Sequence, residues 1–198
     1  MEGPHIKVRE ITPDEAPALL ELQLENRDWF ERFSPARAPG FYTLEHQLQL
    51  IRKQEEARRQ DQAYEFGIFT NTGGRLIGTI SLFQIRRGPL QSALIGYDLS
   101  RACNGKGYTT EAVRLLVDCG FRRLGLHRIE AGVMPHNIAS IRVLEKSGFQ
   151  KEGLARQNVR INGRWEDHQV LAILNPDDGE EGAEPEPGQA TDKMEKRQ

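Results

Sequence analysis

The segment CNGKGYTTEAV, residues 103–113, decides which fold this chain can adopt. Two glycines one residue apart, Gly105 and Gly107, stand directly before residues that favour a helix. The stretch SALIGYDLS at 92–100 comes before them and has the length and composition of a strand. The segment is therefore predicted to be a glycine-rich turn that leads from a strand into a helix.

Glycine-rich turns of this kind often hold phosphate groups, but two familiar nucleotide motifs do not fit. The motif GxxxxGK[ST] requires glycine at position 100 and serine or threonine at position 107, where the chain has Ser100 and Gly107. The motif GxGxxG requires a third glycine where Thr110 stands. Two interpretations stay open: a plain connection between strand and helix, or an anion site formed by the first amides of the helix, around 107–110.

Hydrophobic periodicity predicts the other elements and places the chain in the α/β (α+β) class, with a mixed sheet flanked by helices. A hairpin is expected across Asn162-Gly163, and one helix is expected to begin at Asn137 and to stop at Gly148. The expected strands are 6–11, 63–70, 75–85, 92–100, 127–134, 149–161 and 164–174. The expected helices are 12–33, 43–60, the segment from the glycine turn to about 124, and 137–148.

Composition predicts a single domain at 1–175 and an acidic, disordered tail at 176–198, which has too little apolar content to pack. The net charge of -2 indicates neither DNA nor a membrane as a partner. The two cysteines form no CxxC motif and no zinc-type cluster, so we expect no metal and a reducing compartment. The start of the chain lacks the apolar run of a signal peptide, and the expected location is therefore the cytoplasm.

About thirty residues after the glycine turn stands MPHNIASIRVLEKSGF, residues 134–149. The two segments together resemble the GCN5-related N-acetyltransferases, and the resemblance covers residues 6 to about 174. It implies a largely antiparallel sheet of about seven strands with about four helices, splayed between the fourth and fifth strands. It also implies acetyl-CoA as cosubstrate, with a backbone amide near Leu99 facing the thioester. The residues expected to hold acetyl-CoA are Leu99, Asn104, Gly105, Lys106, Gly107, Tyr108, Thr109, Thr110 and Asn137.

Several short segments resemble one branch of that family, the ribosomal-protein-alanine N-acetyltransferases. They are ENRDWFERFSP at 25–35, HRIEAGVMPHN at 127–137, GFQKEG at 148–153 and INGRWEDH at 161–168. This resemblance implies that the acceptor is the N-terminal α-amine of a protein, with a ribosomal protein as one such partner. Two alternatives stay open: a small amine such as a polyamine or an antibiotic, and a non-catalytic CoA-binding or ribosome-associated module. The chain could act as a monomer or as a homodimer.

The resemblance also suggests catalytic residues. Ser140, one turn into the helix that starts at Asn137, is expected to protonate the CoA thiolate, although it could instead cap the helix. Asn137 could cap the helix, contact the cofactor, or do both. Glu25 is the favoured acceptor-facing acid among the possible bases, which are Glu25, Glu31, Asp98, Glu130, Asp167, His136 and His168. Three aromatic side chains could line the acceptor cleft or the core: Trp29, Phe30 and Phe33.

Overall fold

The computed structural model describes residues 1–179, which fold around one seven-stranded sheet with the order β1-β2-β3-β4-β5-β7-β6. Only β4 and β5 are parallel neighbours, so the sheet is mixed and largely antiparallel, as predicted. The strands are β1 (Ile6–Arg9), β2 (Ala63–Thr70), β3 (Leu76–Arg86), β4 (Ser92–Leu99), β5 (Arg128–Val133), β6 (Gln150–Ile161) and β7 (Arg164–Leu174).

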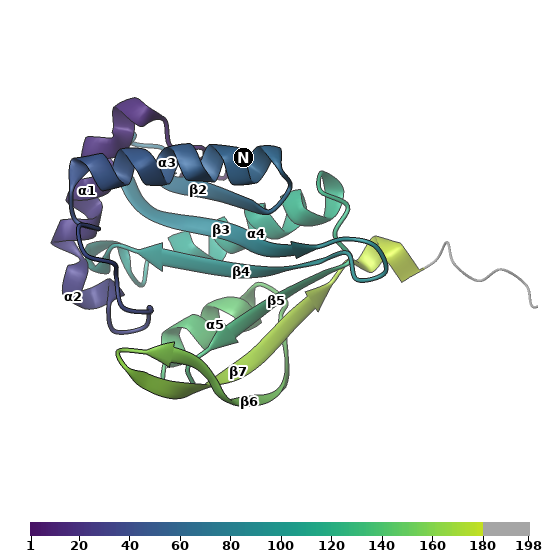
Figure 1. The fold of residues 1–198 in the computed structure, drawn as a ribbon. Helices are drawn as coiled ribbons and strands as arrows, with labels where there is room; N and C mark the ends of the chain where they lie inside the picture. The colour runs from purple at the N-terminus through teal and green to yellow at the C-terminus, as the bar shows by residue number, and fades with distance from the viewer. Residues whose placement is uncertain (180–198) are drawn as a thin grey trace, which may run out of the picture.

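Helices cover both faces of the sheet. In Figure 1, α3 lies against one face, while α4 and α5 lie against the other. The α-helices are α1 (Ala16–Glu25), α2 (Arg27–Phe30), α3 (Leu44–Arg59), α4 (Tyr108–Arg122) and α5 (Ile138–Lys146). Residues 1–179 also contain three short 3₁₀ turns, which are η1 (Pro13–Glu15), η2 (Arg101–Cys103) and η3 (Pro176–Gly179). No helix within 1–179 is both long enough and apolar enough to cross a bilayer.

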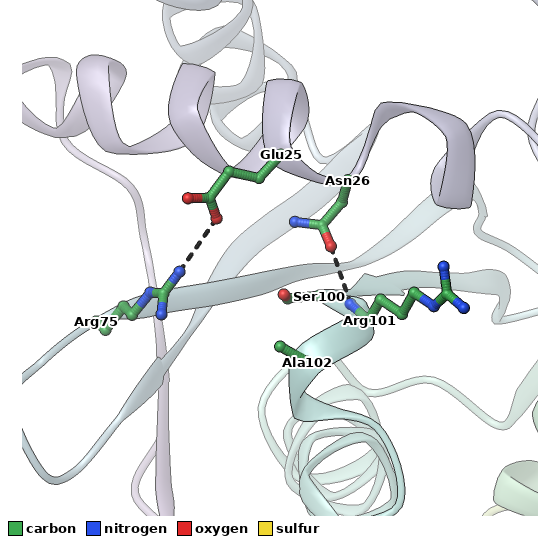
Figure 2. A pocket seen from close by; sticks show the side chains of 6 residues that line it. All are labelled: Glu25, Asn26, Arg75, Ser100, Arg101 and Ala102. Atoms are coloured by element: carbon green, nitrogen blue, oxygen red, sulfur yellow. Dashed lines mark hydrogen bonds and ion pairs between the residues drawn. The ribbon is translucent and has the colours of Figure 1, made fainter.

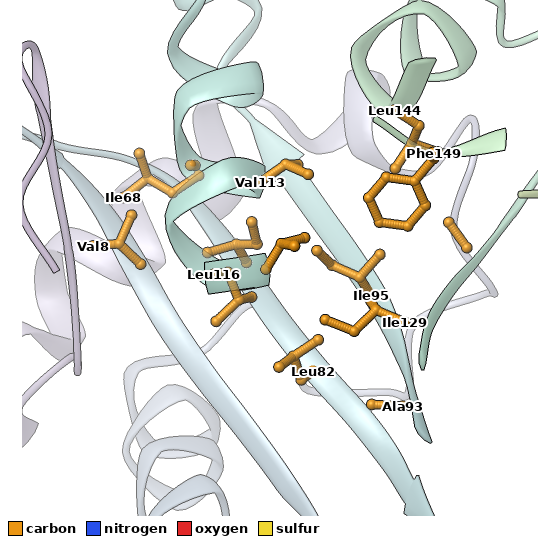
Figure 3. Packing of buried hydrophobic residues seen from close by; sticks show 14 of the residues in the cluster. Val8, Ile68, Leu82, Ala93, Ile95, Val113, Leu116, Ile129, Leu144 and Phe149 are labelled. Atoms are coloured by element: carbon orange, nitrogen blue, oxygen red, sulfur yellow. The ribbon is translucent and has the colours of Figure 1, made fainter. Parts of the chain in front are cut away.

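Two apolar cores lie on the two faces. The larger one packs α4 and α5 onto the sheet through residues such as Leu82, Ile95, Leu116 and Ile129, several of them drawn in Figure 3. The smaller one joins α1, α3 and the sheet and includes Leu19, Leu22, Phe30, Ile51 and Phe69. Burial of this aliphatic surface is the main force that holds the helices against the strands.

The strands β4 and β5 pair over only three residues each, and this positions the site. The register runs from Ser92 opposite Arg128 to Leu94 opposite Glu130 and then ends. β4 nevertheless continues to Leu99, and β5 continues to Val133. The two strands therefore diverge over their carboxyl-terminal halves, toward the end of the sheet where α2 lies (Figure 1). This is the predicted splay between the fourth and fifth strands.

The local turn predictions are confirmed. Asn162 and Gly163 have φ angles of 47° and 82°, as a two-residue hairpin between β6 and β7 requires. The Asn137 side chain accepts a hydrogen bond from the Ser140 amide and so caps α5, and Gly148, with φ of 97°, follows the end of that helix.

One expectation needs correction. The helix expected at 12–33 is broken at Asn26, whose backbone leaves the helical region and whose side-chain amide donates to the Leu22 carbonyl. The acidic tail expected at 176–198 begins with the 3₁₀ turn η3, in which Asp178 contacts His127. The rest of that tail, 180–198, lies outside the described residues.

Candidate active site

The glycine turn between β4 and α4 needs glycine for its backbone conformation. Gly105 and Gly107 have φ angles of 76° and 84°, in the left-handed region that side chains with a Cβ avoid. A Cβ at either position would meet no atom within 4 Å, so space is not the constraint. Gly107 is the N-cap of α4, so a residue with positive φ directly precedes the first residue of the helix.

The first amides of α4 have no acceptor within the described chain. The first helical hydrogen bond runs from the Glu111 amide to the Gly107 carbonyl at 3.0 Å. The amides of Tyr108, Thr109 and Thr110 therefore stand free at the positive end of a fifteen-residue helix. Free amides at this position suit a phosphate or pyrophosphate group.

The edge of β4 that faces β5 carries free backbone groups beyond Leu94. The Ser100 amide donates to the Ile77 carbonyl of β3 at 2.8 Å. Because backbone groups in a strand alternate in direction, the amide of Leu99 points away from β3 and toward β5. At that level β5 no longer pairs with β4. A hydrogen-bond donor therefore faces the gap between the two strands.

Ser140 and Tyr97 meet across this gap. The Tyr97 hydroxyl of β4 lies 2.8 Å from the Ser140 Oγ of α5 and 3.3 Å from the Ser140 carbonyl oxygen. Burial raises the pKa of Tyr97 to about 12, while its hydrogen bond with Ser140 lowers it. The phenol is thus protonated at neutral pH and holds the Ser140 side chain. Our sequence analysis missed Tyr97, although its position two residues before Leu99 on one strand places both side chains on the same face.

Asp98 follows Tyr97 on β4 and points to the opposite face. Its carboxylate lies 3.7 Å from Arg37 of the loop between α2 and α3, and 30% of the Asp98 side chain is exposed. Burial raises the pKa of Asp98, and the Arg37 charge lowers it. Glu65 of β2 carries a second half-buried carboxyl near this pair, and its pKa is raised by burial first and by Asp98 to a smaller degree. Within the described residues the Arg37 Nε is buried without a hydrogen-bond partner.

Glu25, the acid favoured from the sequence, lies at a different place. It is at the carboxyl end of α1, where its exposed carboxylate pairs with Arg75 at 3.1 Å. Both residues line an open cavity of about 580 Å³ together with Asn26, Ser100, Arg101 and Ala102 (Figure 2). The cavity borders the residues that lead into the glycine turn, but within 1–179 neither a hydrogen bond nor an ion pair joins Glu25 to Tyr97, Asp98 or Ser140.

The other candidate bases are engaged in local structure. Glu31 accepts from Tyr42 at 2.7 Å, and that hydrogen bond, helped by Arg27, lowers its pKa. Glu130 pairs with two arginines, Asp167 accepts from the Gln157 amide, and His168 is buried with its Nδ1 near the Glu166 carbonyl. Asp98 is thus the candidate that combines burial, a position beside the gap and a weakly held carboxylate. Within 1–179 no group of three or more His, Cys, Asp or Glu could hold a metal ion.

Two aromatic side chains of the α2 region span the mouth of the gap. The ring centroid of Phe33 lies 5.8 Å from that of His136, which stands just before α5, and 6.3 Å from that of Trp29. Trp29 in turn lies 5.9 Å from the guanidinium of Arg101, just after β4. Both aromatic residues are half-buried, whereas Phe30 is 3% exposed and belongs to the core. Phe30 therefore has the core role, and Trp29 also packs against that core, while the role of these residues in an acceptor cleft stays a prediction.

Comparisons with known proteins agree on one family. Residues 5–150 match the model described as an acetyltransferase (GNAT) domain. YjcK of Bacillus subtilis strain 168, a probable N-acetyltransferase, is 61% identical over 178 residues, which cover 90% of this chain and 98% of that protein.

Solved structures give the same result. A ribosomal-protein-S5-alanine acetyltransferase from Vibrio fischeri matches with a TM-score of 0.84 and 33% identity, covering 89% of this chain and 97% of that one. RimJ of Mycobacterium smegmatis, solved in complex with CoA-disulfide, matches with a TM-score of 0.84 and 26% identity, covering 89% of this chain and 88% of that one. The similarity thus extends over most of the described domain.

Proposed function

Because this chain belongs to the acetyltransferase (GNAT) family and is therefore an N-acetyltransferase, we propose that it transfers the acetyl group of acetyl-CoA to the N-terminal α-amine of a protein. A ribosomal protein is the expected acceptor. The solved relative from Vibrio fischeri, which is named for alanine of ribosomal protein S5, supports this acceptor class.

One observation above all supports acetyl-CoA as the donor. The free amides at the start of α4 stand beside the gap between β4 and β5, on whose far side Ser140 lies. In this proposal the amides of 107–110 hold the pyrophosphate, with Asn104, Gly105 and Lys106 in the turn around it. The positive φ angles of the glycines let the backbone approach the phosphates closely.

The reaction requires a neutral amine, a stabilised carbonyl oxygen and a protonated leaving sulfur. The amine nitrogen attacks the thioester carbon, and the carbon–sulfur bond breaks. The Leu99 amide donates to the carbonyl oxygen as its negative charge develops. Ser140 donates its hydroxyl proton to the sulfur and regains a proton from the nitrogen, while Tyr97 holds the Ser140 side chain. Asn137 caps the helix that carries Ser140.

Asp98 is the residue we propose to accept the first proton from the acceptor ammonium. Burial raises its pKa toward the range in which a carboxylate is an effective base, and its contact with Arg37 is long for an ion pair. Glu25, proposed from the sequence for the acceptor side, contributes from the neighbouring cavity only if the acceptor extends there. A weak base is sufficient for an α-amine, because about a quarter of it is already neutral at pH 7.5, against about 0.1% of a lysine side chain.

Release of CoA thiol with a panel of acceptors tests this function. We expect the highest kcat/KM with peptides that carry a free N-terminal alanine or serine. The same peptides with a blocked N-terminus and one lysine are the matched control and should react far more slowly. Faster turnover of polyamines or aminoglycosides would assign the chain to small amines. CoA binding without turnover of any amine would indicate a non-catalytic module.

A further inference from the structure

Trp29 lies between two arginine side chains at the mouth of the gap. The guanidinium of Arg32 is 5.6 Å from the Trp29 ring and 5.6 Å from the Phe33 ring, and that of Arg101 is 5.9 Å from the Trp29 ring. Cation–π contacts of this kind orient the guanidinium groups and leave their hydrogen-bond donors available. We call these four residues, Trp29, Arg32, Phe33 and Arg101, the basic rim.

Neither arginine of the basic rim has a carboxylate within 4.0 Å in the part of the chain that the structure describes. Some other surface arginines within 1–179 do, such as Arg27 with Glu31 and Arg122 with Asp118, and some, such as Arg52 and Arg142, do not. Asp28, one helical turn before Arg32, forms no ion pair with it. Figure 2 shows the Arg101 side chain pointing away from the pair that Glu25 forms with Arg75. The positive charge of the rim is therefore not balanced locally.

The position of Arg101 is set by the fold. The Asn26 Oδ1 accepts from the Arg101 amide at 2.9 Å, and Asn26 itself is 5% exposed. This bond fixes the α1–α2 junction to the residues that follow β4. On the other side, the Asn162 side chain donates to the Glu31 carbonyl at 2.9 Å and ties the β6–β7 hairpin to α2. The rim is thus held over the gap from both sides.

We propose that the basic rim binds acidic side chains of the acceptor at peptide positions 2–4, where the acetylated residue is position 1. This inference rests on the proposed function, because it takes the acceptor to be a peptide N-terminus that enters the gap. An extended chain advances about 3.3–3.6 Å per residue, so the residues behind the reacting amine leave the gap across α2. Carboxylates there pair with Arg32 and Arg101, whereas lysines are repelled.

Binding and turnover of three peptide series test the proposal. The series share a free N-terminal alanine and differ only in having aspartate, serine or lysine at positions 2–4. With the native protein we expect kcat/KM to be highest for the aspartate series and lowest for the lysine series. The Kd of C-terminally labelled peptides, measured with CoA present, should follow the same order. The differences between the series in kcat/KM and in Kd should both become smaller at 0.5 M salt, because the rim is exposed to solvent and salt screens its charge.

Charge reversal provides the sharpest variants. Arg32→Glu and Arg101→Glu should each raise the Kd of the aspartate series about fivefold or more, the upper range for exposed ion pairs, and should strengthen binding of the lysine series. The serine series and the KM for acetyl-CoA should change little. Arg122→Glu, on the far end of α4, is the matched control and should leave the order unchanged. An equal loss for all three series would mean that the variants only disturb packing around Trp29, and would overturn the proposal.

The Kd measurements distinguish a failure of this proposal from a failure of the proposed function. If no peptide is acetylated but the aspartate series binds with the expected charge dependence, the rim stands and the proposed reaction fails. If the peptides are acetylated with no preference for charge, the reaction stands and the rim proposal fails. A third result would assign the rim to nucleic acid instead. In that case an RNA oligonucleotide binds the native protein but not Arg32→Glu, and peptide affinities do not depend on charge.

Discussion

The Tyr97 hydroxyl lies 2.8 Å from the Ser140 Oγ and joins β4 to α5 across the gap where β4 and β5 have stopped pairing. The Ser140 backbone amide, and not its side chain, takes part in the helix cap, because Asn137 Oδ1 accepts from that amide at 3.2 Å. The Ser140 hydroxyl therefore has no capping task and is available to a group in the gap. The contacts of the Ser140 side chain are thus separate from the helix cap, as the proton-donor role that we propose for Ser140 requires.

Ser140→Ala should lower kcat by about 10²-fold, the low end for loss of a positioned acid, and leave the affinity for acetyl-CoA nearly intact. The loss of the Tyr97 hydrogen bond should cost about 1 kcal/mol of unfolding free energy. Steady-state kinetics and thermal unfolding check both effects. Full kcat in the folded variant would remove Ser140 from the reaction and leave water or Tyr108 as the proton source.

Tyr97→Phe tests whether the phenol holds Ser140 in place. We expect kcat to fall about tenfold, less than in Ser140→Ala, because a hydroxyl without its partner samples other rotamers. The KM values should stay close to those of the native protein. In the double variant the effects should not add, since Tyr97 acts only through Ser140. Additive losses would indicate a separate role for Tyr97.

Asp98→Asn should reduce kcat/KM by about 10²-fold and stabilise the folded protein at neutral pH. The sign follows from linkage: a carboxyl whose folded pKa is raised binds protons more tightly in the folded state, so stability is lost as pH rises from the unfolded pKa through the folded pKa. Asparagine removes this loss. The melting temperatures of the two proteins should therefore differ at pH 7 and converge below about pH 4. A lower melting temperature at pH 7 would contradict this account.

Arg37→Gln should move the acidic limb of the pH profile of kcat/KM to higher pH. Arg37 lowers the pKa of Asp98, and removal of its charge raises that pKa further. Glu65 also faces this pair, and its negative charge then acts without the balance of Arg37. Arg27→Gln, which breaks a pair with Glu31 instead, is the control and should leave the limb in place. An unmoved limb in Arg37→Gln would exclude Asp98 as the base.

Gly107→Val should strongly weaken acetyl-CoA binding, because a β-branched residue resists a φ of 84° and shifts the amides at the start of α4. Gly88→Val is a matched control. Gly88, in the turn between β3 and β4, also has a positive φ and free space around its Cα, so it brings similar backbone strain at a distance from the cradle. We expect both variants to lose stability and only Gly107→Val to lose cofactor affinity. Equal affinity in the two variants would make Gly107 a turn residue only.

Features that depend on a few neighbouring residues were determined by the sequence alone. The glycine turn, the Asn137 cap and the Asn162-Gly163 hairpin follow from backbone angles and hydrogen bonds within a few residues. The family resemblance supplied the splay, because the two segments that border it carry the matching motifs. The alternation that places Tyr97 and Leu99 on one face of β4 was equally present in the sequence, but it could not name the partner of Tyr97.

Contacts between distant segments were decided only by the tertiary structure. The pairing of Tyr97 with Ser140 and of Asp98 with Arg37 depends on how strands and helices pack, and no local pattern encodes it. The break at Asn26 has the same origin: its side chain holds the Arg101 amide, and this distant contact overrides the helical pattern of 12–33. Our proposal of Asp98 as the base beside Glu25 rests on the same kind of information, because the sequence does not specify that the Asp98 side chain is largely buried next to Arg37 while the Glu25 carboxylate is exposed and paired with Arg75.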